Sequence, residues 1–600
     1  MTMIDLAGGV RGAQAFVEMR DGAKMNTLVY LPSCEGPFPV ILARTPYGIT
    51  KPQGQHTTDP AYGWLPDPAE PLRGSMLRGW QKITARGYGC VYQDTRGRFA
   101  SEGEDRVYFD DAEDGYDTID WIAAQPWCNG RIGMAGSSAG ATTTLAAASQ
   151  NHPALKAFWA QVGGSSIYDD VVCEGQSIEM ERLWLWVAKN IPGLSASHKA
   201  RAMQLAGLDE AGMEAAHKRA AETYNRLEAA SRADVPFIEN ADWLRLPMTD
   251  YPDFSVWQPF LNELITHPAP DAFRAAHNFR RTINIPGFHA TSWYDIFLTS
   301  VMAAFQDIQA RTGNQKLWIG PNDHYFIYQN NFWSRDPFFG WFGHYLKDEK
   351  TALIDEPPVY FSPRAFVADR EGYKPDDWLH SATWPPAGAE TKRLYLTGSG
   401  DLADQPGGKP RSYTYDPRQP NPTYGGRNML ISNGSHDQRP AQARPNYGLI
   451  YSGEPLAEPL TLSGRVKVTL HAGSDCPDTD FIAKLNEVTP DGRAMLLLDG
   501  VTRAMYRASV LDSLQSRPQR LEPGEVYEIT IDLGEIRTTI AAGSRLQVDV
   551  VSSNFPRRAR NTNSGNAVLA KDGEGDIRVA TNTVHHSGVH SSFLEITVLP

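Results

Sequence analysis

Several features that would point to particular classes of protein are missing from this chain of 600 residues. Its five cysteines are odd in number, far apart and without a CxxC pair, which argues against a disulfide framework and a zinc site. Lys and Arg total 57 against 70 Asp and Glu, and no basic run interrupts the acidic balance. The sequence therefore lacks the electrostatic footprint of a protein that binds nucleic acid or anionic lipid.

Long apolar runs are also missing. Every apolar stretch is broken by a charged residue or glycine well before the ~20 residues that a membrane-spanning helix needs. The first residues lack the basic and apolar regions of a secretory signal. We therefore expect a cytoplasmic protein without membrane contact that acts on a small molecule, and the sequence predicts neither a metal nor a cofactor. Its oligomeric state stays open, with a homo-oligomer as one alternative.

The pattern of short apolar runs and helical stretches predicts three regions. Buried strands alternate with helices up to residue 166 and again from 281 to 352, which indicates an α/β domain with a largely parallel sheet. Residues 167–280 interrupt this pattern as a helical cap, in which Ser197 to Ser231 contains no proline and is predicted to be helical throughout. From 353 to 600 the period-two alternation predicts an all-β sandwich of the jelly-roll type, with 401–445 as a long surface loop.

A nucleophile motif lies where the third predicted strand meets a helix. Gly136-Ser-Ser138-Ala-Gly140 follows an apolar strand and precedes an Ala- and Thr-rich helix, the context that G-x-S-x-G requires. Small residues two before and two after the serine leave room for its sharp turn, so Ser138 is predicted as the nucleophile. Ser137 is the weaker alternative, because it would place Ala135 and Ala139 at the glycine positions.

An aspartate and a histidine follow in the chain order that this class of hydrolase uses. Asp295 comes after one strand-like run and His324 after the next, 29 residues further on, which leaves room for one crossover helix. Asp295 is predicted to orient His324, and His324 to act as the general base. His344 is the second choice for the base, and His289 is predicted to be a buried, hydrogen-bonded residue.

Several stretches spread over nearly the whole chain resemble the cocaine-esterase-like branch of the α/β-hydrolases, which includes α-amino-acid ester hydrolases and X-Pro dipeptidyl peptidases. The resemblance implies an α/β-hydrolase domain with a helical cap and a C-terminal jelly roll. It also implies an oxyanion hole made by the Tyr47 hydroxyl and the Ala139 backbone N–H. The family commonly has tyrosine where this chain has Ala139, so the acyl pocket should differ. The matching stretches are Arg44-Thr-Pro-Tyr47, Gln93-Asp-Thr-Arg-Gly97, Trp127 to Ser138, Trp293-Tyr-Asp295, Gly320-Pro-Asn-Asp-His324, Asp478 to Leu485 and Ser552 to Arg557.

The predicted substrate contacts are the cap residues Trp184 and Trp186, together with Trp293 near Asp295. After Asp295 the chain continues Ile-Phe-Leu-Thr, without the acidic residues that hold a substrate ammonium in the α-amino-acid ester hydrolases it resembles. Two sets of acids are interpreted as solvated carboxylates without a ligand: Asp169, Asp170 and Glu174 in the cap, and Asp475, Asp478 and Asp480, whose spacing lacks the EF-hand pattern.

The sequence thus favours a serine hydrolase that cleaves carboxylic esters of small or medium acyl groups through an acyl-enzyme, with amides as a further substrate class. One alternative is an α-amino-acid ester hydrolase or X-Pro dipeptidyl-peptidase-like aminopeptidase. Another is an inactive protein whose C-terminal domain binds carbohydrate.

Overall fold

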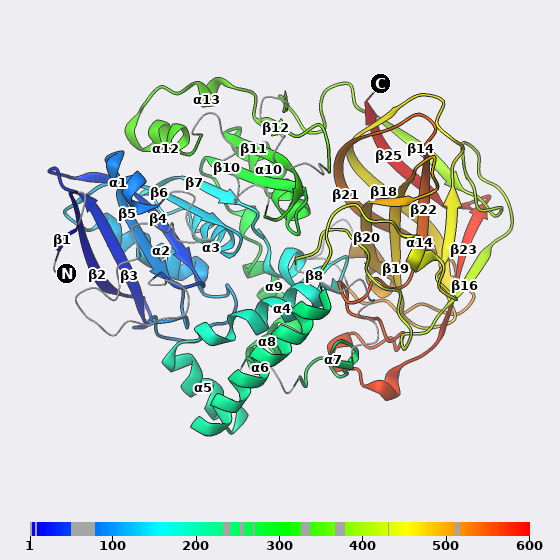
Figure 1. Cartoon of the computed structure of the whole chain (residues 1–600), viewed down its shortest axis with the longest axis horizontal. Helices are drawn as coiled ribbons and strands as arrows, with labels where there is room; N and C mark the ends of the chain where they lie inside the picture. The colour runs from blue at the N-terminus through cyan, green and yellow to red at the C-terminus, as the bar shows by residue number, and fades with distance from the viewer. Residues whose placement is uncertain are drawn as a thin grey trace.

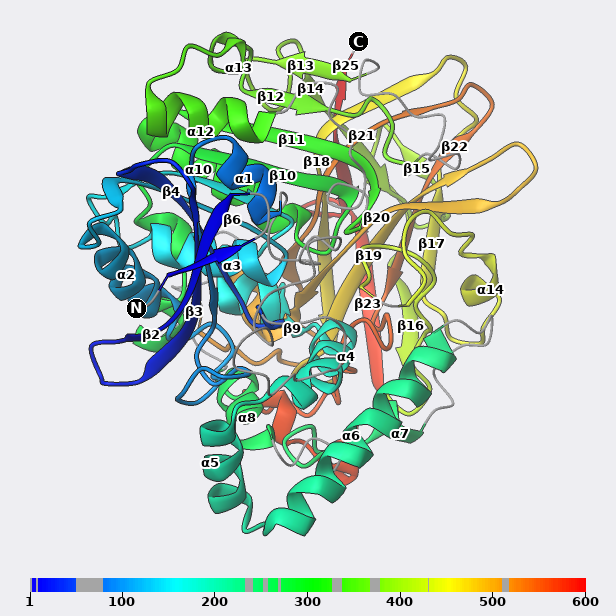
Figure 2. The same cartoon turned by 60° about the vertical axis from the view of Figure 1, so that its left-hand side comes forward.

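The computed structural model describes residues 3–6, 9–49, 79–231, 241–251, 257–267, 271–325, 337–366, 378–429, 431–509 and 517–599. Two large bodies stand side by side, an α/β domain and an all-β domain, and a group of helices lies across one end of their junction (Figure 1). The view turned by 60° shows the same helices below both bodies (Figure 2). This confirms the predicted fold class.

The α/β domain is built on one 11-stranded sheet with the order β1-β2-β3-β5-β4-β6-β7-β10-β11-β12-β13. The seven strands from β5 to β12 in this order pair in parallel, and antiparallel strands extend the sheet at both edges. The central strands are buried along their whole length because helices cover both faces. The strands are β1 (Ile4–Leu6), β2 (Val10–Glu18), β3 (Lys24–Pro32), β4 (Phe38–Thr45), β5 (Gly89–Asp94), β6 (Cys128–Ser137), β7 (Leu155–Gln161), β10 (Gly287–Tyr294), β11 (Gln315–Asp323), β12 (Val359–Phe361) and β13 (Leu379–Ser381).

Two apolar clusters hold the helices against this sheet. On one face, α2 (Asp111–Ala123), α3 (Ala139–Ala148) and α10 (Leu298–Thr312) bury their apolar sides. On the other face, α1 (Trp80–Ala85), α12 (Pro337–Lys347) and α13 (Ala352–Asp355) do the same. The sheet continues to β13, so the expected domain boundary at residue 352 falls before its last two strands.

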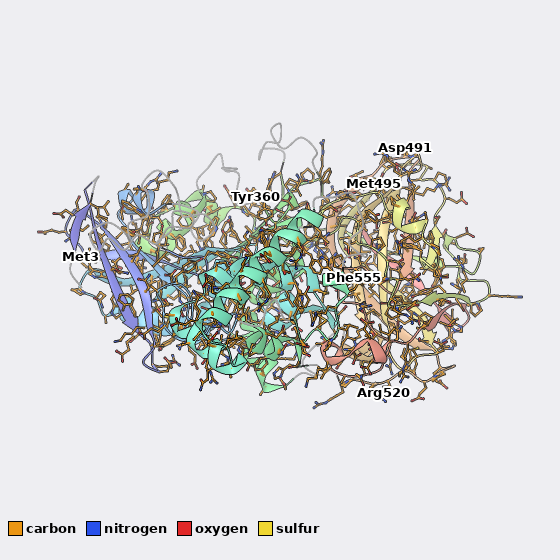
Figure 3. The ribbon with its side chains drawn as sticks, turned by 60° about the horizontal axis from the view of Figure 1, so that its bottom comes forward. Met3, Tyr360, Asp491, Met495, Arg520 and Phe555 are labelled. Carbon is orange, nitrogen blue, oxygen red and sulfur yellow. The ribbon has the colours of Figure 1, made fainter. Side chains whose placement is uncertain are left out.

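The cap enters between β7 and β10. It contains a single π turn, η1 (Ile167–Val172), the short strands β8 (Cys173–Glu174) and β9 (Ser177–Ile178), and the helices α4 (Met180–Asn190), α5 (Ala196–Ala206), α6 (Glu210–Ser231), α7 (Ala241–Leu244), α8 (Gln258–Ile265) and α9 (Ala272–Ala276). Figure 3 shows these helices in front of the junction, with Met3 at the far end of the α/β domain and Phe555 in the all-β domain.

The prediction of one continuous helix from Ser197 to Ser231 was wrong. Gly207 ends α5 in the left-handed conformation, with φ of 65°. The backbone N–H of Leu208 then donates a hydrogen bond to the Met203 carbonyl in the last turn of the helix. Glycine adopts this conformation without steric cost, which makes it a common stop after a helix. Asp209 then starts α6, and its side chain accepts a hydrogen bond from the Gly212 N–H at 2.7 Å.

The C-terminal domain consists of two antiparallel sheets. One has the order β15-β14-β25-β18-β23-β16, with β21 also on β18 and β24 on β23, and the other has the order β17-β22-β19-β20. The period-two pattern of the sequence becomes the alternation of buried and exposed residues along these strands. The strands are β14 (Glu390–Leu396), β15 (Leu402–Ala403), β16 (Arg411–Tyr415), β17 (Leu449–Ser452), β18 (Leu460–Ser474), β19 (Asp480–Val488), β20 (Ala494–Arg503), β21 (Tyr527–Ile540), β22 (Arg545–Val551), β23 (Ala580–Ser587), β24 (His590–Ser591) and β25 (Phe593–Leu599).

Residues 401–445 do not form the predicted surface loop. They contain β15, β16 and α14 (Arg439–Gln442), and several of their polar residues are buried. Asn421 donates to the Tyr447 carbonyl at 2.7 Å, and Arg427 reaches Glu174 of the cap at 3.1 Å. Composition indicated an irregular backbone but not its burial, which depends on hydrogen bonds to distant residues.

A buried network of charges joins the cap to the all-β domain. Arg558 pairs with Glu174 at 2.6 Å and with Glu179, and Arg557 pairs with Asp499 at 2.5 Å. Burial opposes the ionisation of Glu174, but the charges of Arg558, Arg427 and Arg557 outweigh it and hold the pKa of this carboxyl well below its usual range. Glu174 is therefore not the solvated carboxylate that we expected.

In the part of the chain that the structure describes, we find no helix with the length and apolar character needed to cross a membrane.

Replacing Arg558 with methionine should loosen the cap from the all-β domain. The change leaves the buried Glu179 and Glu174 without their nearest cation, which should lower the free energy of unfolding by about 3 kcal/mol. Urea unfolding followed by circular dichroism measures the loss. Arg418→Met is the matched control, because that arginine pairs with Asp416 at an exposed site, and it should unfold like the wild type. Equal stability of both variants would contradict a coupling role for the network.

Candidate active site

Ser138 occupies a strained turn between β6 and α3. Its backbone has φ of 55° and ψ of −124°, a combination that L-residues rarely adopt. A Cβ atom at Gly136 would lie 2.1 Å from the carbonyl oxygen of Gly140, so the turn closes only with glycine there. The G-x-S-x-G spacing thus has a steric cause in this fold.

Asp295 and His324 follow β10 and β11, which are neighbours in the parallel sheet. Their side chains therefore emerge at the same edge as Ser138. His324 Nδ1 lies 2.6 Å from Asp295 Oδ1, and His324 Nε2 lies 3.0 Å from Ser138 Oγ. Thr291 donates to the second oxygen, Asp295 Oδ2, at 2.7 Å. The hydroxyl of Ser138, both ring nitrogens of His324 and both carboxylate oxygens of Asp295 thus take part in hydrogen bonds.

The two alternatives raised by the sequence lie elsewhere. Ser137 directs its hydroxyl to the Gln161 side chain, at 3.2 Å. His344 is on α12, and its Nδ1 contacts the Glu349 carbonyl at 3.2 Å. His289 is buried on β10 and bonds Gln315 at 3.0 Å, and burial lowers its pKa to about 4. Of these serines and histidines, the structure brings Ser138 and His324 together.

Tyr47 is a further polar side chain near the serine. It follows the end of β4, and its hydroxyl interacts with the Ser138 side chain and accepts a hydrogen bond from Trp186 Nε1 at 3.0 Å. Burial raises the pKa of Tyr47, which keeps the phenol protonated and able to donate at neutral pH. Ala139 is the first residue of α3, and backbone N–H groups in the first turn of a helix have no partner within the helix.

The three tryptophans predicted as substrate contacts have different surroundings. Trp186 is half-buried and lies beside Tyr47, with its ring between Tyr108 and Trp257. Trp184 is fully buried and packs against Tyr251 in the cap. Trp293 is also buried, and it donates to the Ser362 carbonyl and packs against Trp384. The structure therefore brings Trp186 to the reacting groups and places the other two among packed side chains.

Arg182 and Phe297 are site residues that the sequence did not reveal. The Phe297 ring lies 5.9 Å from the His324 ring. Arg182, on the cap helix α4, lies 5.2 Å from the centre of the Phe297 ring and donates to the Ile296 carbonyl at 3.1 Å. Arg182 and Ile296 are 114 positions apart. The local sequence around either residue therefore does not predict this contact.

The acids Asp475, Asp478 and Asp480 were interpreted as solvated, and their surroundings differ: Asp475 is exposed, as expected, and the other two are not solvated. Asp478 and Asp480 are buried, Asp478 pairs with Arg503 at 2.7 Å, and Asp480 accepts from Ser177 at 2.8 Å. Asp475 accepts from the Thr581 N–H at 2.7 Å. A search of the described residues for groups of three or more His, Cys, Asp or Glu side chains that could hold a metal ion finds none.

A strained serine elbow, a histidine and an aspartate at the carboxyl edge of a parallel sheet define a serine hydrolase of the α/β-hydrolase class. Comparison with known proteins gives the family. Residues 21–326 match the X-Pro dipeptidyl-peptidase (S15) family, and residues 357–595 match the C-terminal non-catalytic domain of X-Pro dipeptidyl-peptidases. The chain belongs to this family.

Relatives are similar along the whole chain. A cocaine esterase from Rhodococcus sp. (strain MB1 Bresler) is 30% identical over 98% of both chains, and a putative serine esterase from Mycobacterium bovis is 25% identical over 91% of both. A solved α-amino acid ester hydrolase has a TM-score of 0.73 at 23% identity, covering 100% of this chain and 98% of its own. An aminopeptidase from a Thaumarchaeota archaeon has a TM-score of 0.71 at 23% identity, covering 99% and 97%. These two structures support the fold.

Replacing Gly136 with alanine should disable the site. The new methyl group would meet the Gly140 carbonyl at 2.1 Å, so the elbow must shift and carry Ser138 and the Ala139 N–H with it. We expect hydrolysis of p-nitrophenyl acetate to fall by about 10²-fold or more, because displacements of about 1 Å have such effects. Gly407→Ala is the control, since its Cβ would meet no atom within 4 Å. A fully active Gly136→Ala enzyme would show that the elbow tolerates a side chain.

Proposed function

We propose that this protein is a serine esterase that cleaves carboxylic esters of small or medium uncharged acyl groups through an acyl-enzyme. The observation that carries this proposal is the hydrogen-bonded line Asp295–His324–Ser138. The Tyr47 hydroxyl interacts with the same serine, and α3 begins at the next residue. The chain is similar to a cocaine esterase and to a putative serine esterase over almost their whole lengths, and this similarity supports ester cleavage.

In the acylation step, Ser138 Oγ attacks the carbonyl carbon of the ester and forms the new C–O bond. A serine hydroxyl is too weakly acidic to do this unaided, so His324 Nε2 takes its proton as the bond forms. The Asp295 carboxylate accepts a hydrogen bond from the Nδ1–H of His324 and stabilises the imidazolium without taking its proton. Thr291 donates to the same carboxylate and holds it in place. The carbonyl oxygen becomes an oxyanion that the Tyr47 hydroxyl and the Ala139 N–H stabilise.

The tetrahedral intermediate then expels the alcohol. His324 returns its proton to the leaving alkoxide, and the acyl group stays on Ser138 as an ester. In the second half of the reaction, water attacks this ester while His324 Nε2 takes a proton from the water. The second tetrahedral intermediate then breaks its bond to Ser138 Oγ, and His324 returns the proton to that oxygen. The products are the carboxylic acid and the free serine, with His324 neutral again. Amides could enter the same cycle, but their poorer leaving groups depend more strongly on proton donation by His324.

The charges around the site favour an uncharged acyl group. Glu174 pairs with Arg427, Arg557 and Arg558, Asp170 lies 3.4 Å from Arg280, and Asp169 lies 3.4 Å from Arg274. Each of these three cap acids thus has an arginine partner. In addition, the Arg182 guanidinium lies against Phe297 next to His324, where it would repel a cation.

The identity of the nucleophile can be read by covalent labelling. A fluorophosphonate should phosphonylate the wild type on the peptide that contains Ser138, and Ser138→Ala should lose both labelling and ester hydrolysis while keeping its fold. Ser137→Ala is the matched control and should retain both, because its hydroxyl faces Gln161. Labelling that is lost in the Ser137 variant would contradict the assignment. A wild type without labelling or turnover would instead favour the inactive, carbohydrate-binding alternative.

Acyl specificity can be measured with a matched substrate pair. We expect kcat/KM for a phenylacetyl ester to exceed that for the phenylglycyl ester of the same alcohol by about 10²-fold or more, because an ammonium without a counter-charge costs several kcal/mol to desolvate. Repeating the comparison at a pH where the phenylglycyl amine is neutral should reduce the difference. A preference for the protonated phenylglycyl ester would support the α-amino-acid ester hydrolase alternative.

A further inference from the structure

A line of polar contacts crosses the active site beyond the three residues Ser138, His324 and Asp295. It begins at Trp186 Nε1, which lies 3.0 Å from the Tyr47 hydroxyl, and that hydroxyl in turn interacts with Ser138. From Ser138 the line continues through His324 to Asp295. The cap and the catalytic sheet thus contribute to one line of polar atoms.

The chemistry of the two end groups determines which atom donates in each hydrogen bond of this line. The Asp295 carboxylate accepts hydrogen bonds, so His324 donates through Nδ1 and accepts through Nε2. The Ser138 hydroxyl therefore donates to Nε2. At the other end, an indole N–H can only donate, so the Tyr47 oxygen accepts from Trp186. Tyr47 therefore keeps its own O–H as a donor, and the Ser138 side chain is a second polar contact of this hydroxyl.

We propose that Trp186 is a positioning residue of the oxyanion hole, whose indole N–H orients the Tyr47 hydroxyl and strengthens it as a donor. This rests on the proposed serine-esterase function. Accepting a hydrogen bond polarises a hydroxyl and makes its own proton a better donor. The effect acts on the reaction through Tyr47, so Trp186 supports the transition state without touching the carbonyl oxygen.

The surroundings of Trp186 keep its N–H in place. Its ring packs against Tyr108 and Trp257, and its backbone carbonyl accepts from Asn190 at 2.7 Å within α4. The buried Arg98 ties the two sides together, because it donates to the Pro46 carbonyl at 2.9 Å and to the Asn190 carbonyl at 2.8 Å. Residue 46 directly precedes Tyr47, so Arg98 fixes the spacing between Tyr47 and the end of α4.

A different role for Trp186 would leave a different kinetic signature. If the indole served only as an apolar wall for the acyl group, its loss would change KM and would depend on the size of the acyl group. An effect through the Tyr47 hydroxyl should change kcat by the same factor for acetyl, butyryl and benzoyl esters. It should also vanish once the hydroxyl is removed.

The test is a double-mutant cycle of Trp186→Phe and Tyr47→Phe, measured on the three p-nitrophenyl esters. Tyr47→Phe should lower kcat by about 10²-fold or more, since it removes one oxyanion donor. Trp186→Phe keeps a ring but loses the N–H, and we expect kcat to fall about 3- to 10-fold with little change in KM. In the Tyr47→Phe background, the same substitution should change kcat by less than about 2-fold.

Trp257→Phe is the matched control. This tryptophan packs against Trp186 in the same cluster, but its N–H donates to the Asp105 carbonyl at 3.0 Å. Its loss should change kcat by less than about 2-fold on each ester. Melting curves and complete phosphonylation of Ser138 establish that each variant is folded. Trp186→Met serves as a second variant that lacks the indole N–H.

The outcomes separate the two proposals. A loss from Trp186→Phe that persists in the Tyr47→Phe background, or that grows with the size of the acyl group, overturns the positioning role while leaving the esterase function intact. A wild type that neither turns over esters nor labels at Ser138 overturns both. Independence from acyl size together with disappearance in the Tyr47→Phe background supports the proposal.

Discussion

Residues that are far apart in the sequence meet at this site because the strands before them run parallel in one sheet. Tyr47, Ser138, Asp295 and His324 come directly after β4, β6, β10 and β11 or within two residues of their ends. In this sheet β4 is paired with β6 and β10 with β11, so the residues that follow them lie along one edge. Without this alignment, the hydrogen bonds of 2.6 Å and 3.0 Å around His324 would not form.

The alignment of these residues also depends locally on a strained turn, the elbow at Ser138. Ser138 keeps an unfavourable backbone conformation because β6 and α3 are each fixed by their own packing, and the single residue between them must make the turn. The same turn presents the first N–H groups of α3 beside the serine. One strained residue therefore places the Ser138 hydroxyl and the Ala139 backbone N–H next to each other.

The cap and the all-β domain hold this edge from outside through buried arginines. Arg98 connects the segment before Tyr47 to α4, and Arg182 connects α4 to the turn after Asp295. Arg427 of the all-β domain reaches Glu174 in the cap and Thr299 at the start of α10. Buried guanidinium groups are costly unless carboxylates or carbonyls satisfy them. Their partners come from different domains, so the arrangement links the domains to the site.

The α/β domain, the helical insertion, the all-β region and the candidate triad could all be predicted from the sequence. These features rest on hydrophobic period, on the glycines around Ser138 and on chain order, all of which are local or one-dimensional. Gly207 is also a sequence signal for the end of α5. It was overlooked because the stretch contains no proline, which is the stronger helix-breaking residue.

The burial of polar groups and the contacts between side chains of different domains become visible only in the folded structure. The pairing of Glu174 with Arg557 and Arg558 joins residues nearly 400 positions apart, and the contact of Trp186 with Tyr47 joins residues 139 positions apart. A period shows which face of a strand or helix is apolar, but it does not show what lies opposite that face. For this reason, the sequence could suggest Trp186, Trp184 and Trp293 as substrate contacts, and only the packing of the cap shows that Trp186 donates to the Tyr47 hydroxyl.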